Sequence, residues 1–449
     1  MTNPAPRDSW GERLPRTVGL LPAILVLIGI TIGSGIFRTP PTIAGFIPSP
    51  VAIMVLWVVF GLISLCGALA VAELSSMLPK SGGAYVFLRE AYGDAAAFVF
   101  GWIYVLIATP ASIAALATVF GEFLLSLLNL PPAPATVQAI AIAAILSLTF
   151  ANVLGARVGA GISGMTTFVK VTALAAIILG TFLLGEGSAA NFAPTGPVQV
   201  EGLARAMASV IWTYDGWVAV SMIAGEVVAP ERLMKRIIIS GMLIIMALYI
   251  GANLAYFYMM PIDVLAVQKA AVARTVMQSI AGPVGGAAII LAMMTSVFGA
   301  LNGNFLAYPR VTYAMARDGL TFAFLGTIHR RWSSPWIAIV VEGVAAIVLV
   351  LTLRDFDRLT TFFIVVLWAA LVFAVASIFV LRRTMPDAPR PFRTPGYPWV
   401  PLCFVVGTLA GVSAIVWGEI DGGNYSPLYG LFIAAAGFPV HHVWRRLGR

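Results

Sequence analysis

Long apolar runs separated by short polar segments fill most of the chain. Runs such as 139–149 and 237–252 contain no charged residue. An apolar segment of about 20 residues can cross a bilayer as a helix, whereas strands of a membrane barrel alternate in polarity over about 10 residues. The pattern therefore predicts an all-α membrane protein. We expect twelve spans, near 18–46, 50–78, 94–128, 134–152, 157–184, 202–229, 235–260, 282–309, 335–353, 359–381, 398–418 and 425–444.

The composition supports this class. Of the 449 residues, 60% are apolar and 10% are charged, whereas soluble domains carry charge on about a quarter of their residues. Such a chain is not a soluble, disordered or disulfide-rich protein. The net charge of +8 does not indicate nucleic-acid binding, because the basic residues stand singly between apolar runs.

The basic residues also predict an orientation. With the N-terminus in the cytoplasm, 19 of the 27 lie in cytoplasmic segments and 5 on the opposite side, as the positive-inside rule requires. The other three, Arg38, Lys170 and Arg310, fall within spans. We expect a multi-pass plasma-membrane protein with both terminal segments, 1–17 and 445–449, in the cytoplasm, and a short interfacial helix at 85–93.

The first span is interrupted near its middle by Gly33-Ser34-Gly35. Each glycine costs a helix about 1 kcal/mol relative to alanine, and freed backbone groups at membrane depth must be buried in protein or line a wet cavity. Two interpretations are open. Gly29 and Gly33 could let another helix approach closely. Alternatively, the break could bind a zwitterion, with N–H groups attracting a carboxylate and carbonyls attracting an ammonium.

A second interruption favours the binding site. The sixth span contains Asp215-Gly216 near its middle, and it begins a second set of five spans at 202–381 that follows the first set at 18–184. Five spans reverse the side from which the next set starts, so the two sets would be inverted repeats, with two further spans at 398–444. Paired interruptions in corresponding helices indicate a transporter site at the midplane.

At four stretches the chain resembles the amino acid-polyamine-organocation (APC) superfamily of permeases, most closely its L-type amino acid transporter branch. These stretches are Ile32–Phe37, Ala72–Tyr85, Trp212–Pro230 and Tyr313–Gly319. The resemblance implies a five-plus-five inverted repeat with two extra helices, and secondary transport of an amino acid by alternating access. If the source is a bacterium, we expect the protein in the inner membrane.

The resemblance also implies roles for the residues at the breaks. The substrate carboxylate would be bound by the backbone N–H groups of Gly33, Ser34 and Gly35. The substrate amino group would be bound by the carbonyls of Thr31, Trp212 and Asp215. Trp212 would close over the substrate as an aromatic gate; the alternative is an aromatic side chain facing lipid or the interface.

Ionisable residues inside spans are functional candidates, because their insertion costs several kcal/mol. By resemblance, Lys170 on span five occupies the place of a cation site in sodium-coupled relatives of the fold. It could carry a coupling proton, tie span five to carbonyls of span one, or snorkel to the interface. These three interpretations stay open.

Five further charged residues are given roles. Arg38 and Asp215 could form an ion pair that latches the outer side of the site, or Arg38 could reach the outer interface while Asp215 caps the second half of span six. Glu226 is a candidate for an inner gate. Arg310 is interpreted as an interface anchor, and Glu73 as an ordinary charge at a helix end.

Five residues are predicted to face the substrate side chain: Thr109, Ser112, Phe298, Asn302 and Trp368. Because Asp215 is the one negative charge expected there, a neutral amino acid is favoured over a cationic one or a polyamine. A nutrient sensor or a channel on the same fold is a further alternative.

The sequence offers no catalytic machinery. Its three histidines fall at the predicted cytoplasmic surface, and no metalloprotease, serine-hydrolase or cysteine-cluster motif is present. We therefore expect no enzyme activity, metal or cofactor. Cys66 and Cys403 each lie within an apolar run, so no disulfide-linked heavy chain is expected. The predicted partners are an amino acid and the lipid bilayer, with proton coupling left open.

Overall fold

A computed structural model describes residues 14–268, 272–352 and 356–446. The rest of the predicted terminal segments, 1–13 and 447–449, lies outside the described residues. The first half of the chain forms α1 (Leu20–Thr31), α2 (Gly35–Phe46), α3 (Pro50–Met77), α4 (Ala84–Tyr92), α5 (Asp94–Ile103), α6 (Thr109–Leu127), α7 (Pro134–Val153) and α8 (Ala156–Leu184).

The second half begins with a second broken helix. Its helices are α9 (Val200–Tyr214), α10 (Ala219–Met222), α11 (Pro230–Met259), α12 (Ile262–Ala266), α13 (Val272–Ala307), α14 (Pro309–Arg317), α15 (Trp336–Thr352), α16 (Phe356–Thr384), α17 (Trp399–Asp421) and α18 (Ser426–Arg446). The all-helical class is thus confirmed for the described part of the chain, in which an isolated bridge joins Val18 to Val227.

Nine segments in the described residues are long and apolar enough to cross a membrane. The other three predicted spans contain α9 with α10, the shorter α15, and α18. Helices therefore occupy every predicted span, while the number that cross the bilayer and the repeat symmetry stay predictions. One boundary moves: α13 starts ten residues before the predicted 282, and a non-helical kink at Ala281 and Gly282, just before Pro283, marks the predicted start.

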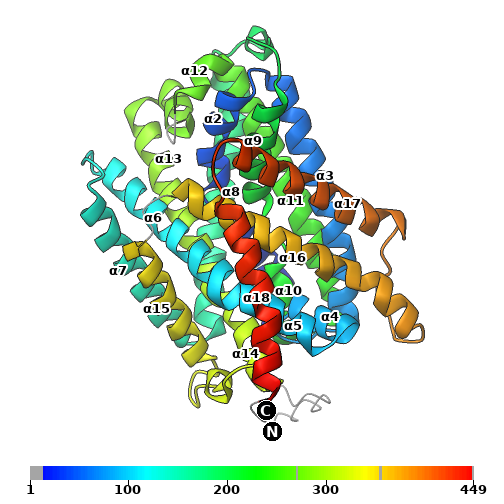
Figure 1. The fold of residues 1–449 in the computed structure, drawn as a ribbon. Coiled ribbons are helices and arrows are strands. Elements are labelled where there is room, and N and C mark those ends of the chain that lie inside the picture. The colour runs from blue at the N-terminus through cyan, green and yellow to red at the C-terminus, as the bar shows by residue number, and fades with distance from the viewer. Residues whose placement is uncertain (1–13, 269–271, 353–355, 447–449) are drawn as a thin grey trace.

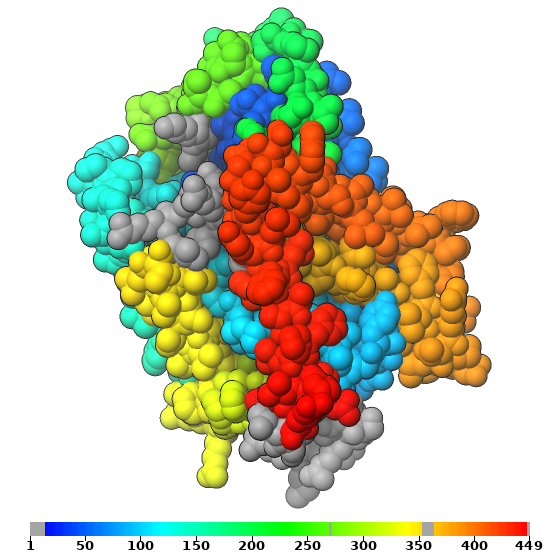
Figure 2. Space-filling model, in the orientation of Figure 1, coloured from blue at the N-terminus to red at the C-terminus, as the bar shows by residue number. Residues whose placement is uncertain are grey.

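The two breaks lie at the centre of the helix bundle. Helix α1 packs against α8, α11 and α13, while α2 packs against α9. Helices α4 and α14 and the C-terminal end of α18 lie at one end of the molecule, and α2 and α12 lie at the other (Figure 1). Helix α18 lies on the surface of the face shown in Figure 2. Three of the segments predicted to be cytoplasmic thus lie at the same end.

The predicted interfacial helix exists as α4, but it is packed inside the protein. Its residues Ala84 to Leu88 are buried, and the helix contacts α5, α14 and α16. The Tyr85 hydroxyl donates to Asp318 Oδ2 at 2.8 Å, and Arg89 Nη1 donates to Asp318 Oδ1 at 2.8 Å. Burial raises the pKa of Asp318, although both donors oppose that shift. Two sequence stretches that carry the family resemblance therefore meet at this carboxylate.

This contact predicts a loss of stability in Tyr85→Phe. Removing the hydroxyl deletes one hydrogen bond to a buried carboxylate, which costs about 1.5–3 kcal/mol. Thermal unfolding of the purified protein in detergent should show a lower midpoint for Tyr85→Phe than for Tyr92→Phe, a control on the exposed end of the same helix. Equal midpoints would show that the hydroxyl contributes nothing to stability.

Candidate functional site at the two broken helices

The first break is a non-helical turn of three residues. Helix α1 ends at Thr31, Ile32 leaves the helical region with φ −82° and ψ 85°, and α2 starts at Gly35. A Cβ on Gly35 would lie 2.6–2.8 Å from three side-chain atoms of Thr213 on α9. Glycine is therefore required at Gly35 by the close approach of the second broken helix.

The second break crosses the first directly. Helix α9 ends at Tyr214, and Gly216 has a φ of +107°, a conformation that favours glycine. A Cβ on Gly216 would lie 3.0 Å from Ile30 and 3.2 Å from the backbone of Thr31. The two interruptions seen in the sequence are therefore one structural centre.

Tyr249 on α11 joins the two breaks, and nothing in the sequence pattern indicated it. Its hydroxyl lies 2.9 Å from the carbonyl of Thr31 and 2.9 Å from the carbonyl of Thr213, and its single proton is shared between the two acceptors. The side chains of Thr39 and Thr213 add a hydrogen bond of 3.1 Å between α2 and α9. Carbonyls at the C-terminal ends of α1 and α9 thus accept hydrogen bonds from one buried hydroxyl.

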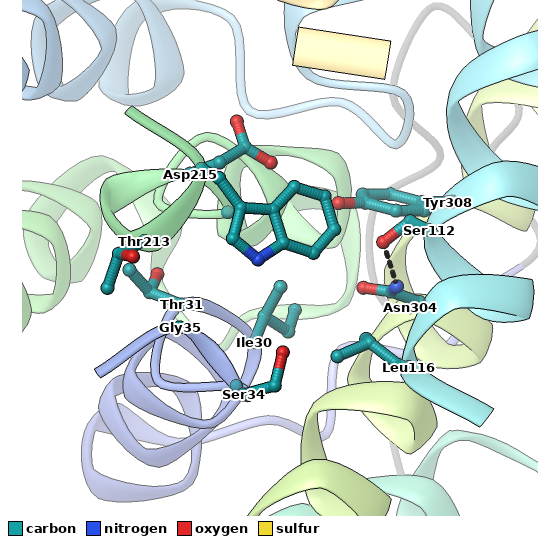
Figure 3. Close-up of a pocket in the computed structure, with 13 residues that line it drawn as sticks. Ile30, Thr31, Ser34, Gly35, Ser112, Leu116, Thr213, Asp215, Asn304 and Tyr308 are labelled. Carbon is teal, nitrogen blue, oxygen red and sulfur yellow. Dashed lines mark hydrogen bonds between the residues drawn. The ribbon is translucent and has the colours of Figure 1, made fainter. Parts of the chain in front are cut away.

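A small cavity lies between the breaks, with about 30 Å³ of space. That volume suits about two water molecules and is smaller than any amino acid. Figure 3 shows Asp215 and Tyr308 on one side of it and Ser34 and Gly35 on the other. The lining residues are Ile30, Thr31, Gly33, Ser34, Gly35, Ser112, Leu116, Trp212, Thr213, Asp215, Gly216, Asn304 and Tyr308.

Several polar groups in this lining lack a protein partner. In the described part of the chain, the hydroxyls of Thr31 and Ser34 are buried without a hydrogen bond. In the same part of the chain, the backbone N–H groups of Ser34 and Gly35, and that of the neighbouring Ile36 outside the lining, also make no backbone hydrogen bond. Because buried polar groups are nearly always paired, these donors indicate a place for a polar ligand.

All six residues predicted at the breaks line the cavity. However, two of the backbone groups that were predicted to bind substrate already form hydrogen bonds within the protein. The N–H of Gly33 donates to the carbonyl of Thr31 at 3.0 Å, and that carbonyl also accepts from Tyr249. A carbonyl oxygen has two lone pairs. Gly33 N–H and Thr31 C=O are therefore not free for a ligand in this state. The N–H of Ile36 is free, although the sequence did not suggest it.

The five residues predicted to face the substrate side chain lie in different places. Ser112 lines the cavity and accepts a hydrogen bond of 2.7 Å from Asn304 (Figure 3). Trp368 lies behind the lining and donates to Asp215 Oδ1 at 3.0 Å. Thr109 is buried outside the lining.

Phe298 and Asn302 also lie outside the lining, so four of the five predicted residues do not line the cavity in this structure. Phe298 packs on Phe120, with ring centroids 5.4 Å apart. Asn302 points toward α8, where it donates to Gly159 and Ser163 at 2.8 Å. Residues two apart in a helix point to nearly opposite sides, so the cavity side of α13 presents Asn304 instead.

Lys170 is fully buried and bound to backbone carbonyls. Its Nζ donates to Gly29 at 2.8 Å, to Ser296 at 2.9 Å and to Ile32. Span five is thereby tied to the end of α1 and to α13. Snorkelling is wrong for this lysine, because Nζ points into the protein. The close-packing interpretation is right for Gly29, where a Cβ would meet Thr167 of α8 at 2.6 Å.

The sequence left two roles open for Arg38 and Asp215, and the structure shows a separate contact for each. Arg38 donates to Glu122 Oε2 on α6 at 2.6 Å, and both side chains are partly exposed. Asp215 is the C-cap of α9 and accepts from Trp368. We call the Arg38 and Glu122 contact the outer pair.

Arg310 is not an interface anchor, because it is buried and paired with Glu226. Its Nε and Nη2 lie 2.7 Å and 3.3 Å from the two carboxylate oxygens, and each side chain is 1% exposed. The Glu226 carbonyl also accepts the N–H groups of Thr17 and Val18 at 2.9 Å. We call these four residues the inner network. It joins the segment before α1 to the exits of the sixth and eighth spans.

Glu73 is likewise more than a helix-end charge. It is buried and accepts from Arg382 at 2.6 Å and 2.9 Å and from the N–H of Thr394 at 2.6 Å. It ties α3 to the connection between α16 and α17. Its burial could not be read from a position near the end of a span.

Comparison with known proteins identifies the family to which this chain is similar. The family model for amino acid permeases matches residues 18–438. The serine/threonine exchanger SteT of Bacillus subtilis (strain 168) is 31% identical over 96% of this chain and 98% of its own. The b(0,+)-type amino acid transporter 1 of Mus musculus is 30% identical over 90% and 84%. The human cystine/glutamate transporter is 29% identical over 98% and 88%.

The contact at the first break predicts different effects for two alanine substitutions. Gly35→Ala would force a Cβ into Thr213, and such overpacking costs about 1–3 kcal/mol. Gly33→Ala is the matched control, because its Cβ would meet Leu116 and Ala300 at ordinary distances of 3.4 Å and 3.5 Å. Thermal unfolding in detergent should show a lower midpoint for Gly35→Ala only. Equal midpoints would contradict the contact between α2 and α9.

Proposed function

The chain belongs to the amino acid permease family, and we propose that it is a secondary active transporter of neutral L-amino acids that works by alternating access. Its relatives are transporters and exchangers of amino acids rather than enzymes. A multi-pass membrane protein follows from the family and from the apolar helices. The proposal concerns the substrate, its site and the mechanism.

The observation that carries this proposal is the set of unpaired N–H donors at the start of α2. A helix N-terminus attracts an anion through its free N–H groups and its dipole. Ser34, Gly35 and Ile36 N–H would bind the substrate carboxylate, joined by the Ser34 hydroxyl. Gly33 would leave room for the carboxylate rather than bind it.

The substrate ammonium would lie at the end of α9. The carbonyls of Trp212 and Asp215 are the acceptors proposed there, and the Asp215 carboxylate adds a negative charge in the lining. Trp212 contacts Phe363 edge-on, with ring centroids 5.4 Å apart. In the proposed cycle Trp212 closes over the substrate as an aromatic gate.

The side-chain end of the cavity is polar and small. Ser112 and Asn304 offer a hydroxyl and an amide beside the apolar Leu116. Such a lining suits a small neutral side chain that can form hydrogen bonds. Because Asp215 lies in the same cavity, a cationic amino acid or a polyamine is the alternative that a substrate test must include.

Alternating access would open one side of the site at a time. The cavity must widen to admit an amino acid, and both of its sides are fastened in this structure: the outer pair joins α2 to α6, and the inner network joins the segment before α1 to α14. Rocking of one helix bundle against the other would separate these contacts alternately. The inverted repeat and the twelve spans are the architecture proposed for that motion.

The proposed location is a bacterial inner membrane with both termini in the cytoplasm. The end of the molecule that carries α4, α14 and the end of α18 would face the cytoplasm. Cys66 and Cys403 are free and lie beside each other between α3 and α17. This placement within spans supports a carrier that works without a disulfide-linked heavy chain.

Counterflow in proteoliposomes tests the function directly. Vesicles loaded with unlabelled serine should accumulate labelled serine, and a panel of neutral, cationic and anionic amino acids and a polyamine should rank the substrates. Preference for arginine or a polyamine would contradict the neutral substrate. Tight binding without flux would indicate a sensor, and flux without saturation would indicate a channel.

Gly33→Leu should abolish amino acid binding while the protein remains folded, because the larger side chain would fill the carboxylate site. Binding to the purified variant is measured by ligand-induced thermal stabilisation, with the counterflow substrate. A methyl ester of that substrate should fail to bind the wild-type protein for the same reason. Retained binding by Gly33→Leu would place the site elsewhere.

We propose that Lys170 stays charged and acts as a tether. An ammonium has three N–H donors and meets three carbonyls here, whereas a neutral amine would turn its lone pair toward one of them. Lys170→Ala should therefore lower exchange and net uptake together, while the remaining activity keeps its pH response. Lys235→Ala, on the first turns of α11, is the matched control. Selective loss of stimulation by a proton gradient would instead make Lys170 the proton carrier.

A further inference from the structure

Glu342 is a buried acid that neither the breaks nor the inner network uses. It lies in α15, about 9 Å along the helix from its start at Trp336, and it is 1% exposed. Thr312 on α14 donates to its Oε1 at 2.9 Å. In the described part of the chain its second oxygen, Oε2, is buried without a hydrogen-bond partner.

A charged carboxylate would be poorly satisfied at this place. An ionised carboxylate away from water costs far more than a neutral polar group unless it is paired and fully hydrogen-bonded. One hydroxyl donor meets one of the two oxygens of Glu342. The acid form carries no net charge, so its unpaired oxygen costs only about 1–3 kcal/mol.

Arg310 is the cation whose charge acts on Glu342, but it is already bound. Its Nε and Nη2 face the two oxygens of Glu226. Tyr308, which lines the cavity, lies within electrostatic reach of both Asp215 and Glu342. Glu342 is therefore within electrostatic reach of the inner network and of one residue in the wall of the cavity.

The other helices packed on α15 add no second cation at this point. They are α6, α7, α14 and the turn Ala323–Gly326. The described residues of α7 and of that turn include no titratable side chain. In α6 the one such residue, Glu122, belongs to the outer pair. Besides Arg310, α14 contains Tyr313 and, at its exposed end, Arg317.

This arrangement contains one buried cation and two buried carboxyl groups. The three side chains are electrically neutral together only when one carboxyl carries a proton. Glu226 receives both hydrogen bonds from Arg310 and so holds the negative charge. We propose that Glu342 is a proton-binding site, and that its proton is released when the inner network opens.

The proposed exchange is balanced in charge. Opening toward the cytoplasm, which rests on the proposed transport cycle, separates Glu226 from Arg310. Arg310, which lies two residues before the Thr312 donor on α14, then loses its paired carboxylate. The Glu342 acid gives its proton to water on the cytoplasmic side, and the resulting carboxylate pairs with Arg310. Closure reverses both steps, so one proton is linked to the position of the inner gate.

Infrared spectroscopy of the purified protein tests the protonated acid without any transport assay. The wild-type protein near pH 7 should show the carbonyl stretch of a buried protonated carboxyl, and that band should be missing in Glu342→Gln. Glu231→Gln removes an exposed carboxylate of α11 and should leave the band unchanged. A band of equal size in the wild-type protein and in Glu342→Gln would overturn the proposal, because the acid would then belong to another residue.

Transport assays measure whether net uptake of substrate is coupled to the proton at Glu342. Glutamine mimics the protonated acid and cannot release a proton, so Glu342→Gln should lose the response of net uptake to an inward proton gradient. Glu342→Asp, which keeps an acid in place, should retain a response. A wild-type response in Glu342→Gln overturns the coupling. If neither the wild-type protein nor any variant transports amino acids, the proposed function fails, while the infrared result still decides whether Glu342 carries a proton.

Discussion

A bilayer provides no water to satisfy the backbone, so each helix break must find its hydrogen bonds within the protein. The contacts around α1 follow from that requirement. Lys170 and Ser296 take the carbonyls of Ile32 and Gly33, and Tyr249 takes those of Thr31 and Thr213. Most of the freed acceptors are thus paired, and the donors at the start of α2 are left facing the cavity. The proposed binding site is the part of the break whose polar groups have no hydrogen-bond partner within the protein.

The sequence was informative where a residue type is costly in its local context. Gly33, Ser34 and Gly35 interrupt a membrane helix, and Lys170 interrupts an apolar run, so each indicated a function before any contact was known. Tyr249 and Asn304 could not be found in this way. A tyrosine or an asparagine is common in a polar-lined bundle, and the choice between Asn302 and Asn304 depends on the rotation of α13. A hydrophobic pattern does not fix that rotation when every face of the helix is apolar.

Charges near the ends of spans were the least predictable feature. Arg310 and Glu73 both have sequence positions typical of a topology signal or an interface anchor, yet both are buried in ion pairs. Their partners are 84 and 309 residues away in the chain, so no local spacing could identify them. Glu342, within an apolar run, carried the same signal as Lys170. An acid in such a run costs several kcal/mol on insertion, so its position alone makes it a functional candidate.

The two buried cations, Lys170 and Arg310, are neutralised in different ways. This difference separates the structural role of Lys170 from the proposed proton-linked role of Arg310. Lys170 is surrounded by backbone carbonyls, which cannot lose or gain a proton, so its contacts fix the first break in place. Arg310 faces the Glu226 carboxylate and lies within electrostatic reach of a second carboxyl that is not bound to it. Only the second arrangement has two electrically acceptable states, one with the proton on Glu342 and one with Arg310 paired to it. A transporter that couples protons to its inner gate requires such a pair of states, and a lysine held by three carbonyls offers only one.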